Sequence, residues 1–264
     1  MDKIYHLTSN KLTKNMIPNG TTYFIINNMF DDIIRKNCIP VSVITILFGD
    51  SYNHPIYPNS FPINLKIIIF GNNFNQAICS KMLPDSIEYI KFGRFFNNFI
   101  SVGALPKSLT TLIFGDHYNQ HINVGILPEN LKNLYLGIAY ESKIMPNALP
   151  ESLKILMFSP INSQLLRDLP KNITKIFLKS CPWTELIYID NVEIYYQQFI
   201  LDAALISGVI DIPKPIHIFS FDKIDISKYD DRYLFSEYRA EFRYDYILHC
   251  ITIVNTKDNS SDKN

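Results

Sequence analysis

The chain has 264 residues, of which 47% are hydrophobic and 19% are charged, and its formal net charge at pH 7 is zero. These values lie within the range of folded globular proteins and argue against an intrinsically disordered chain. Because a neutral chain has no overall field that attracts phosphate backbones, we expect no nucleic-acid partner. No run of 18 apolar residues occurs, so we also expect no membrane partner.

Residues 1–16 are predicted to form an N-terminal cap. Residues 1–10 mix charged and polar side chains and lack the apolar core of a signal peptide. The four cysteines are far apart and include no C-x-x-C pair; they are Cys38, Cys79, Cys181 and Cys250. We therefore expect neither a zinc site nor a disulfide framework, and we expect a cytoplasmic protein with reduced thiols.

Proline recurs with a fixed period over most of the chain. From Pro18 to Pro150 every step has the same length, and Pro170 follows after a slightly shorter one. The intervening prolines are Pro40, Pro62, Pro84, Pro106 and Pro128. A period of about 22 residues indicates a solenoid, in which each coil is too small to be stable alone and relies on its neighbours.

Each period also contains apolar residues with the spacing L-x-x-L-x-F, as in Leu109, Leu112 and Phe114. Because side chains alternate between the two faces of a strand, this spacing predicts one short strand in each coil. The expected strands cover residues 23–27, 44–48, 66–70, 88–92, 110–114, 132–136, 154–158 and 174–178.

Three further columns follow each expected strand. A glycine marks a turn that has either a positive φ or little space; it is Gly49, Gly71, Gly93, Gly115 or Gly137. Asn27 takes this place in the first coil, and asparagine tolerates the left-handed region. An aromatic residue follows and is expected to stack between coils: Phe30, Tyr52, Phe74, Phe96, Tyr118 and Tyr140. Beside it run Asn53, Asn75, Asn97 and Asn119, which we expect to be buried and paired with turn amides and carbonyls.

The unit P-x-S-L-x-x-L-x-F-G-x-x-F-N-Q-x-I resembles the FNIP repeat, which is known from slime-mould proteins and giant viruses of amoebae. The best copies are Pro62–Ile78 and Pro106–Ile122, and the resemblance covers residues 17–180. It implies a right-handed, leucine-rich-repeat-like solenoid with a parallel sheet and an interaction role, and it brings no catalytic residues. Some FNIP-repeat proteins resemble ubiquitin-ligase substrate receptors with an F-box, but residues 1–17 lack the helical pattern of an F-box.

The predicted organisation is therefore a cap (1–16), a β-rich solenoid of about eight 22-residue repeats (17–180), a mixed α/β C-terminal cap or small subdomain (181–255) and a disordered tail (256–264). Within the C-terminal region we expect a helix over residues 193–207, ended by Gly208, and a strand over residues 244–254.

In each expected strand, two positions point away from the core. They form a candidate protein-binding face: Ile25, Leu47, Ile67, Ile69, Tyr89, Lys91, Thr111, Ile113, Asn133, Tyr135, Ile155 and Met157. One interpretation is a contact surface, because contiguous apolar strips mark binding sites. A second is ordinary strand propensity, and a third is that the chain's own C-terminal segment covers the strip.

No motif in the sequence indicates a catalytic or metal-binding site. His117 and His121 are four residues apart, a spacing that suits metal binding only on a helix, and here they follow a strand. Asp116 is interpreted as a solvated turn residue. We expect no metal, no cofactor and no enzymatic activity. The predicted function is a monomeric, non-catalytic protein-interaction module; the alternatives are a ubiquitin-ligase substrate receptor or an enzyme with a site in the C-terminal third.

Overall fold

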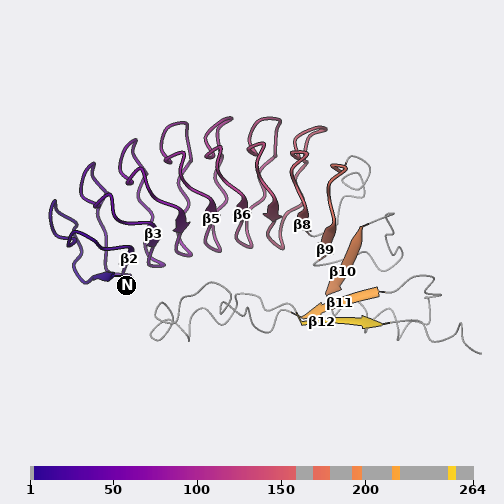
Figure 1. The fold of residues 1–264 in the computed structure, drawn as a ribbon, viewed down its shortest axis with the longest axis horizontal. Coiled ribbons are helices and arrows are strands. Elements are labelled where there is room, and N and C mark those ends of the chain that lie inside the picture. The colour runs from indigo at the N-terminus through magenta and orange to yellow at the C-terminus, as the bar shows by residue number, and fades with distance from the viewer. Residues whose placement is uncertain (1–2, 159–168, 179–191, 198–215, 221–248, 254–264) are drawn as a thin grey trace, which may run out of the picture. The chain divides into compact units, whose positions relative to one another are not determined.

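A computed structural model describes residues 3–158, 169–178, 192–197, 216–220 and 249–253 (Figure 1). The chain divides into two compact units, residues 1–173 and residues 174–264. The predicted cap and tail boundaries at residues 16, 180 and 255 are not tested by this division. The predicted helix end at Gly208 and the tail 256–264 lie outside the described residues.

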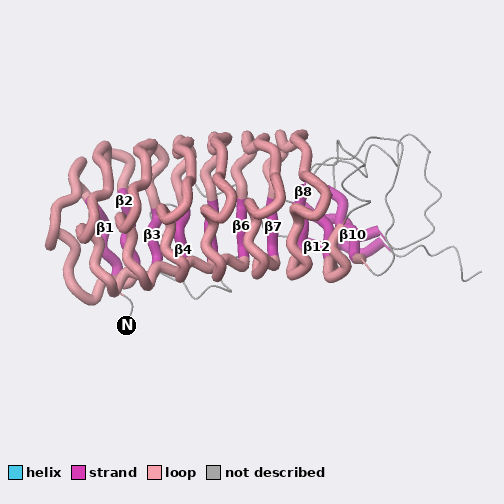
Figure 2. Tube along the Cα trace, turned by 90° about the horizontal axis from the view of Figure 1, so that it is seen from above, coloured by secondary structure: helices cyan, strands magenta, loops and turns pink. Residues whose placement is uncertain are grey.

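The first unit is a stack of coils that each contribute one short strand to a parallel sheet (Figures 1 and 2). From β2 to β8 neighbouring strands pair in parallel with a register of one repeat, as in Ile68 with Ile90. The strands are β1 (Ile4–Leu7), β2 (Tyr23–Ile26), β3 (Thr45–Leu47), β4 (Ile67–Ile69), β5 (Tyr89–Lys91), β6 (Thr111–Ile113), β7 (Asn133–Tyr135) and β8 (Ile155–Phe158). The repeat period therefore equals the length of one coil, and the predicted solenoid is confirmed.

The expected strands agree with the observed ones to within one residue at either end. Strand β1 was not predicted. It pairs with β2 through Ile4 and Tyr23, whose separation in the sequence is shorter than one repeat, so it falls outside the regular period. The residues predicted to form an N-terminal cap thus add one more strand to the sheet.

The core contains two parallel columns of stacked rings. The predicted column is buried along its whole length, and its rings follow one another at centroid distances of 5.8–6.2 Å, in the order Phe30, Tyr52, Phe74, Phe96, Tyr118, Tyr140. A second column runs beside it: Phe48, Phe70, Phe92 and Phe114, at 5.2–5.6 Å. Inside one coil the two columns also touch, with 3.9 Å between the centroids of Phe92 and Phe96. Stacked pairs of this kind each add about 0.5–1.5 kcal/mol beyond area burial.

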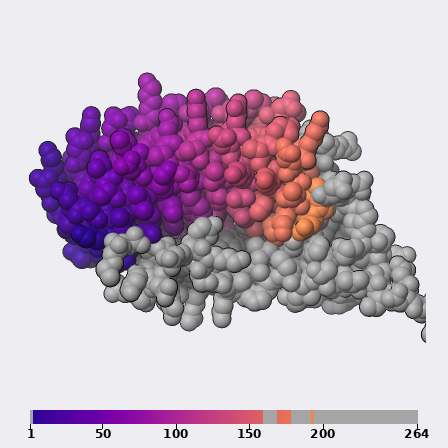
Figure 3. Space-filling model, in the orientation of Figure 1, coloured from indigo at the N-terminus to yellow at the C-terminus, as the bar shows by residue number. Residues whose placement is uncertain are grey.

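The glycine after each strand is required by lack of space. A Cβ on Gly93 would lie against the carbonyl oxygen of Gly71 in the preceding coil, well inside van der Waals contact. None of the five glycines at this position is among the residues with positive φ. Asn27 is not left-handed either, so that expectation was wrong; its side-chain Oδ1 instead accepts the N–H of Met29 at 2.9 Å, which fixes the turn. In Figure 3 the visible face of the first unit is continuous along its length.

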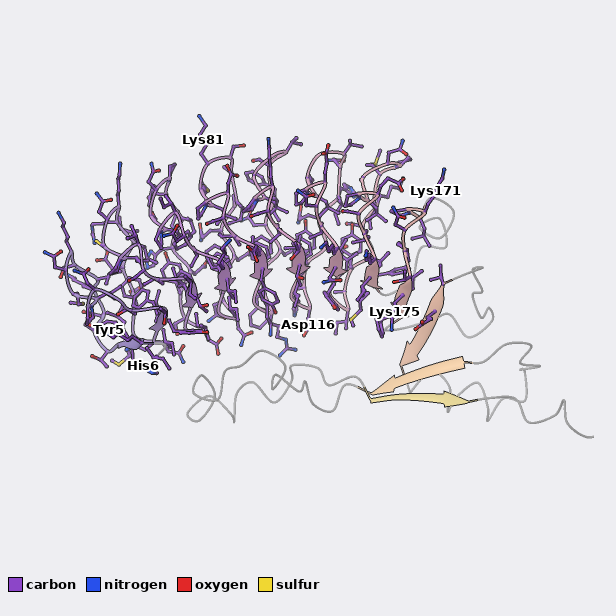
Figure 4. All side chains as sticks on the ribbon, in the orientation of Figure 1. Tyr5, His6, Lys81, Asp116, Lys171 and Lys175 are labelled. Carbon is purple, nitrogen blue, oxygen red and sulfur yellow. The ribbon has the colours of Figure 1, made fainter. Side chains whose placement is uncertain are left out.

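The left-handed residue of each coil lies at a different position, three residues before the proline. It has φ between 62° and 83° in each coil where the structure describes it: Asn15, Asn37, Asn59, Lys81, Gly103, Gly125 and Asn147. Four of these are asparagine and two are glycine, the residue types that adopt this conformation with least strain. Lys81 is the exception, and its side chain projects from the loop tip on the side away from the strands (Figure 4).

Polar groups join successive coils outside the sheet. The Asn75 Oδ1 accepts the N–H of Asn97 at 2.9 Å, and the same bond recurs from Asn53, Asn97 and Asn119 to the next coil. These asparagines are partly or fully exposed rather than buried, so the expected partners are right and the expected burial was wrong. The proline carbonyl of each coil accepts the N–H three residues later, as in Pro62 and Leu65 at 3.1 Å.

The second unit contains four strands in its described residues: β9 (Lys175–Leu178), β10 (Glu193–Gln197), β11 (Ile216–Ser220) and β12 (His249–Ile253). Strand β10 pairs in parallel with β9 and with β11, and β12 pairs antiparallel with β11. The predicted helix over residues 193–207 is wrong in its first five residues, which form β10. The predicted strand over residues 244–254 is confirmed where the structure describes it, as β12.

Candidate protein-binding face

The outward positions of the strands form two columns on one face of the first unit. In one column Ile67, Tyr89 and Thr111 are register partners from β4 to β6, and in the other Ile69, Lys91 and Ile113 are. The same register extends both columns from β2 to β8, so all twelve predicted face residues lie in these two columns. The structure thus brings the predicted residues side by side, while their role in binding stays a prediction.

Exposure along this face is uneven. At its ends Ile25, Leu47 and Met157 are only 3%, 6% and 2% exposed, although they point away from the coil's own core. The members from β4 to β7 are partly exposed: Ile67, Ile69, Tyr89, Lys91, Thr111, Ile113, Asn133 and Tyr135. The surface of interest is therefore this middle part, which we call the strand face.

Two threonines on the outward column differ in their hydrogen bonding. The Thr111 hydroxyl accepts a hydrogen bond from the Asn133 side-chain amide at 3.0 Å. Thr45 is 3% exposed, and its hydroxyl has no hydrogen-bond partner among the described residues. A buried unpaired hydroxyl costs about 1–3 kcal/mol, so Thr45 lowers the stability of its coil.

A row of charged residues flanks the strand face. It is formed by the exposed residues immediately before β4, β5, β7 and β8, which are Lys66, Glu88, Lys132 and Lys154; the half-buried Thr110 precedes β6. The Lys66 Nζ lies 2.6 Å from the Glu88 Oε1, so side chains of this row reach the neighbouring coil. Sequence reasoning missed the row, although its members recur with the same period as the prolines.

His117, His121 and Asp116 lie in turns that follow β6. The His117 ring packs against the ring of Phe95 with 5.0 Å between centroids, and the His121 Nδ1 accepts the N–H of Lys143 at 3.2 Å. Asp116 lies 3.6 Å from the Arg94 guanidinium, near the lower edge of the sheet in Figure 4. These contacts are structural links between successive coils.

Within the described ranges no three His, Cys, Asp or Glu side chains are grouped so that they could hold a metal ion. The described thiols of Cys38 and Cys79 are free. In the part of the chain that the structure describes, no helix is long and apolar enough to cross a membrane.

Comparison with known proteins agrees with this architecture. The FNIP Repeat model matches residues 9–51, 30–73, 52–95, 74–117 and 118–160, which together exceed half of the chain. The crystal structure of CroV588, described as a novel circular LRR protein and coming from a giant virus, is similar with a TM-score of 0.65 and 31% identity. The match covers 74% of this chain but only 30% of that one, and no curated protein matches. The chain belongs to the FNIP-repeat family.

Proposed function

We propose that this chain is a non-catalytic protein-interaction module that binds a partner protein through the strand face. The observation that supports the proposal is the alignment of outward side chains across β4–β7. Apolar residues fill most of one column, including Ile69, Ile113 and Tyr135, where a solvated sheet face usually carries polar ones. A contiguous apolar surface with aromatic members is typical of contact sites.

A double charge substitution tests the proposal. In Ile69→Glu/Ile113→Glu, two carboxylates enter the centre of the strand face, and we expect loss of the proteins that the wild-type full chain captures. The matched control is Ile63→Glu/Val102→Glu, which adds the same charges on loops where these side chains are 74% and 61% exposed. Circular dichroism and the melting temperature establish that both variants are folded.

The expected result is that the control captures the same proteins as the wild type and the strand-face variant does not. If the two variants capture the same proteins in equal amounts, the strand face is not the binding site. For a strand-face variant that melts at a much lower temperature, Ile69→Thr/Ile113→Thr provides the milder change, because threonine retains the branched Cβ that suits a strand.

A further inference from the structure

The first proline turn of the solenoid differs from the turns that follow it. The carbonyl of each repeat proline accepts the N–H of the residue three positions later, as in Pro18 and Thr21 at 3.3 Å. In this first turn the third residue is Gly20, whose φ is 84°, while Asn19 before it is not left-handed. That combination is the pattern of a type II turn. In the described coils that follow, no residue at the position of Gly20 has a positive φ, so the Asn19–Gly20 peptide has a conformation of its own.

Both residues of this peptide are accessible to water. Asn19 and Gly20 are exposed, whereas the next residue, Thr21, is buried and donates its hydroxyl to the Pro18 carbonyl at 2.7 Å. A Cβ built on Gly20 would meet only the side chain of Lys3, at 3.6 Å. The Asn19 side chain therefore has room to turn toward the Gly20 nitrogen, on a turn that is anchored at its end.

An asparagine that is followed by glycine is chemically labile. The backbone nitrogen of the glycine attacks the side-chain carbonyl carbon of the asparagine, which forms a cyclic succinimide and releases ammonia. Water then opens the ring at either carbonyl carbon and leaves aspartate or isoaspartate. A side chain on the second residue hinders the attack, and glycine has none. In this chain Asn19 is the only asparagine that precedes a glycine.

We propose that Asn19 is a site of spontaneous deamidation, in which the Gly20 nitrogen is the nucleophile and water is the co-reactant. A left-handed asparagine on another loop shows the contrast. Asn59 is followed by Ser60, which is 2% exposed and donates its hydroxyl to the Ile34 carbonyl at 2.8 Å. The backbone after Asn59 is therefore held against the core, whereas the backbone after Asn19 is exposed.

Deamidation alters the junction between two adjacent coils. The N–H of Gly20 donates to the Ser42 hydroxyl of the next coil at 3.2 Å. The succinimide nitrogen carries no hydrogen, so this bond is lost when the ring forms. Ring opening restores the N–H but leaves a carboxylate at residue 19, and isoaspartate also inserts a methylene into the main chain. The loop thus acquires a negative charge and, in the isoaspartate form, a longer backbone.

Peptide mapping by mass spectrometry tests the proposal on the full chain. The folded protein is incubated at about pH 8 and about 37 °C, in parallel with protein denatured in guanidinium chloride. We expect a mass gain of about 1 Da at Asn19, divided between aspartate and isoaspartate. The rate in the folded chain is expected to lie within about tenfold of the rate in the denatured chain, because the turn is exposed. In the folded chain Asn59 is expected to react at least about tenfold more slowly than Asn19.

Asn19→Gln is the matched control, because glutamine keeps the amide but forms a cyclic imide only through a larger ring. We expect this variant to show no mass gain in the peptide that contains residue 19. An equal gain in the variant would place the reaction at another residue and overturn the inference. Folding that slows the reaction at Asn19 by more than about tenfold also overturns it, as does an equal rate at Asn59 in the folded chain.

Discussion

The ring of Phe74 lies parallel to the ring of Phe96 in the next coil, with 6.1 Å between their centroids and an angle of 5° between their planes. Both side chains are completely buried, and they occupy equivalent positions in consecutive repeats. One period of sequence thus becomes one step along the stack. Each coil gains its apolar contacts mainly from its two neighbours, which makes the array cooperative.

Phe96→Ala removes one ring from the middle of the column, together with its stacking contacts to Phe74 and Tyr118. We expect the free energy of unfolding to fall by about 3–5 kcal/mol, because the site is close-packed and cannot collapse. The control is Phe95→Ala, whose side chain is 43% exposed and contacts His117 and Arg94. Urea unfolding followed by circular dichroism measures the stability of both variants. Equal losses in the free energy of unfolding would show that the stacked column is not a main source of core stability.

The turn glycine after the strand and the left-handed glycine before the proline are expected to lose different amounts of stability when alanine replaces them. Gly93→Ala places a Cβ against the backbone of the preceding coil, so coils must separate, and we expect a loss larger than about 3 kcal/mol. Gly103→Ala meets no atom within 4 Å, and its cost is the left-handed conformation alone, about 1–2 kcal/mol. Melting temperatures of the two variants rank these costs, and the reverse order would contradict the assignment of the turn glycine to a close approach.

Most of the solenoid could be predicted because its determinants recur at a fixed spacing. Proline recurs at one position, and the strand and ring positions each keep one class of side chain, aliphatic or aromatic, so a single chain displays the pattern several times. The left-handed position could not be identified in this way, since it is filled by asparagine, lysine or glycine. Its tolerance of several residue types reflects a backbone requirement and not a side-chain contact.

Two other features could not be predicted from the repeat pattern. The burial of Ile25, Leu47 and Met157 could not be predicted, because the repeat describes only what lies inside a coil. The expected helix over residues 193–207, ended by Gly208, begins with residues that include Ile194 and Tyr195. β-branched and aromatic residues favour strands, and that propensity was the available signal for β10.

Lys81 is the one non-asparagine, non-glycine residue in the left-handed column, with φ 68°. Lys81→Gly is expected to raise the free energy of unfolding by about 1 kcal/mol, because glycine adopts this conformation without strain. Lys81→Ala keeps the Cβ and is expected to change the stability by less than about 0.5 kcal/mol. Urea unfolding measures the stability of both variants. If Lys81→Ala is also stabilising, the lysine charge and not the backbone conformation lowers the stability of the wild type.

Tyr118 carries a hydroxyl that has no hydrogen-bond partner among the described residues, in a ring that is completely buried. The preceding coil has phenylalanine at this position, Phe96. Tyr118→Phe therefore removes an unpaired polar group, and we expect stabilisation by about 1–2 kcal/mol. Tyr140→Phe is the matched control. The Tyr140 hydroxyl donates to the Lys143 carbonyl at 3.4 Å, so its removal is expected to raise the free energy of unfolding less.

The buried tyrosines also determine how the free energy of unfolding depends on pH in the alkaline range. Burial raises the pKa of Tyr118, and likewise those of Tyr52 and Tyr140, above the ordinary value of 10.0. Stability is then complete below pH 10.0 and falls above it, because the unfolded chain releases phenolic protons that the folded chain keeps. Each tyrosine contributes a slope of about 1.4 kcal/mol per pH unit. Tyr118→Phe should remove about a third of the combined slope when urea unfolding is compared at about pH 9 and about pH 11. An unchanged slope would mean that Tyr118 titrates normally in the folded chain and that its ring is accessible to water.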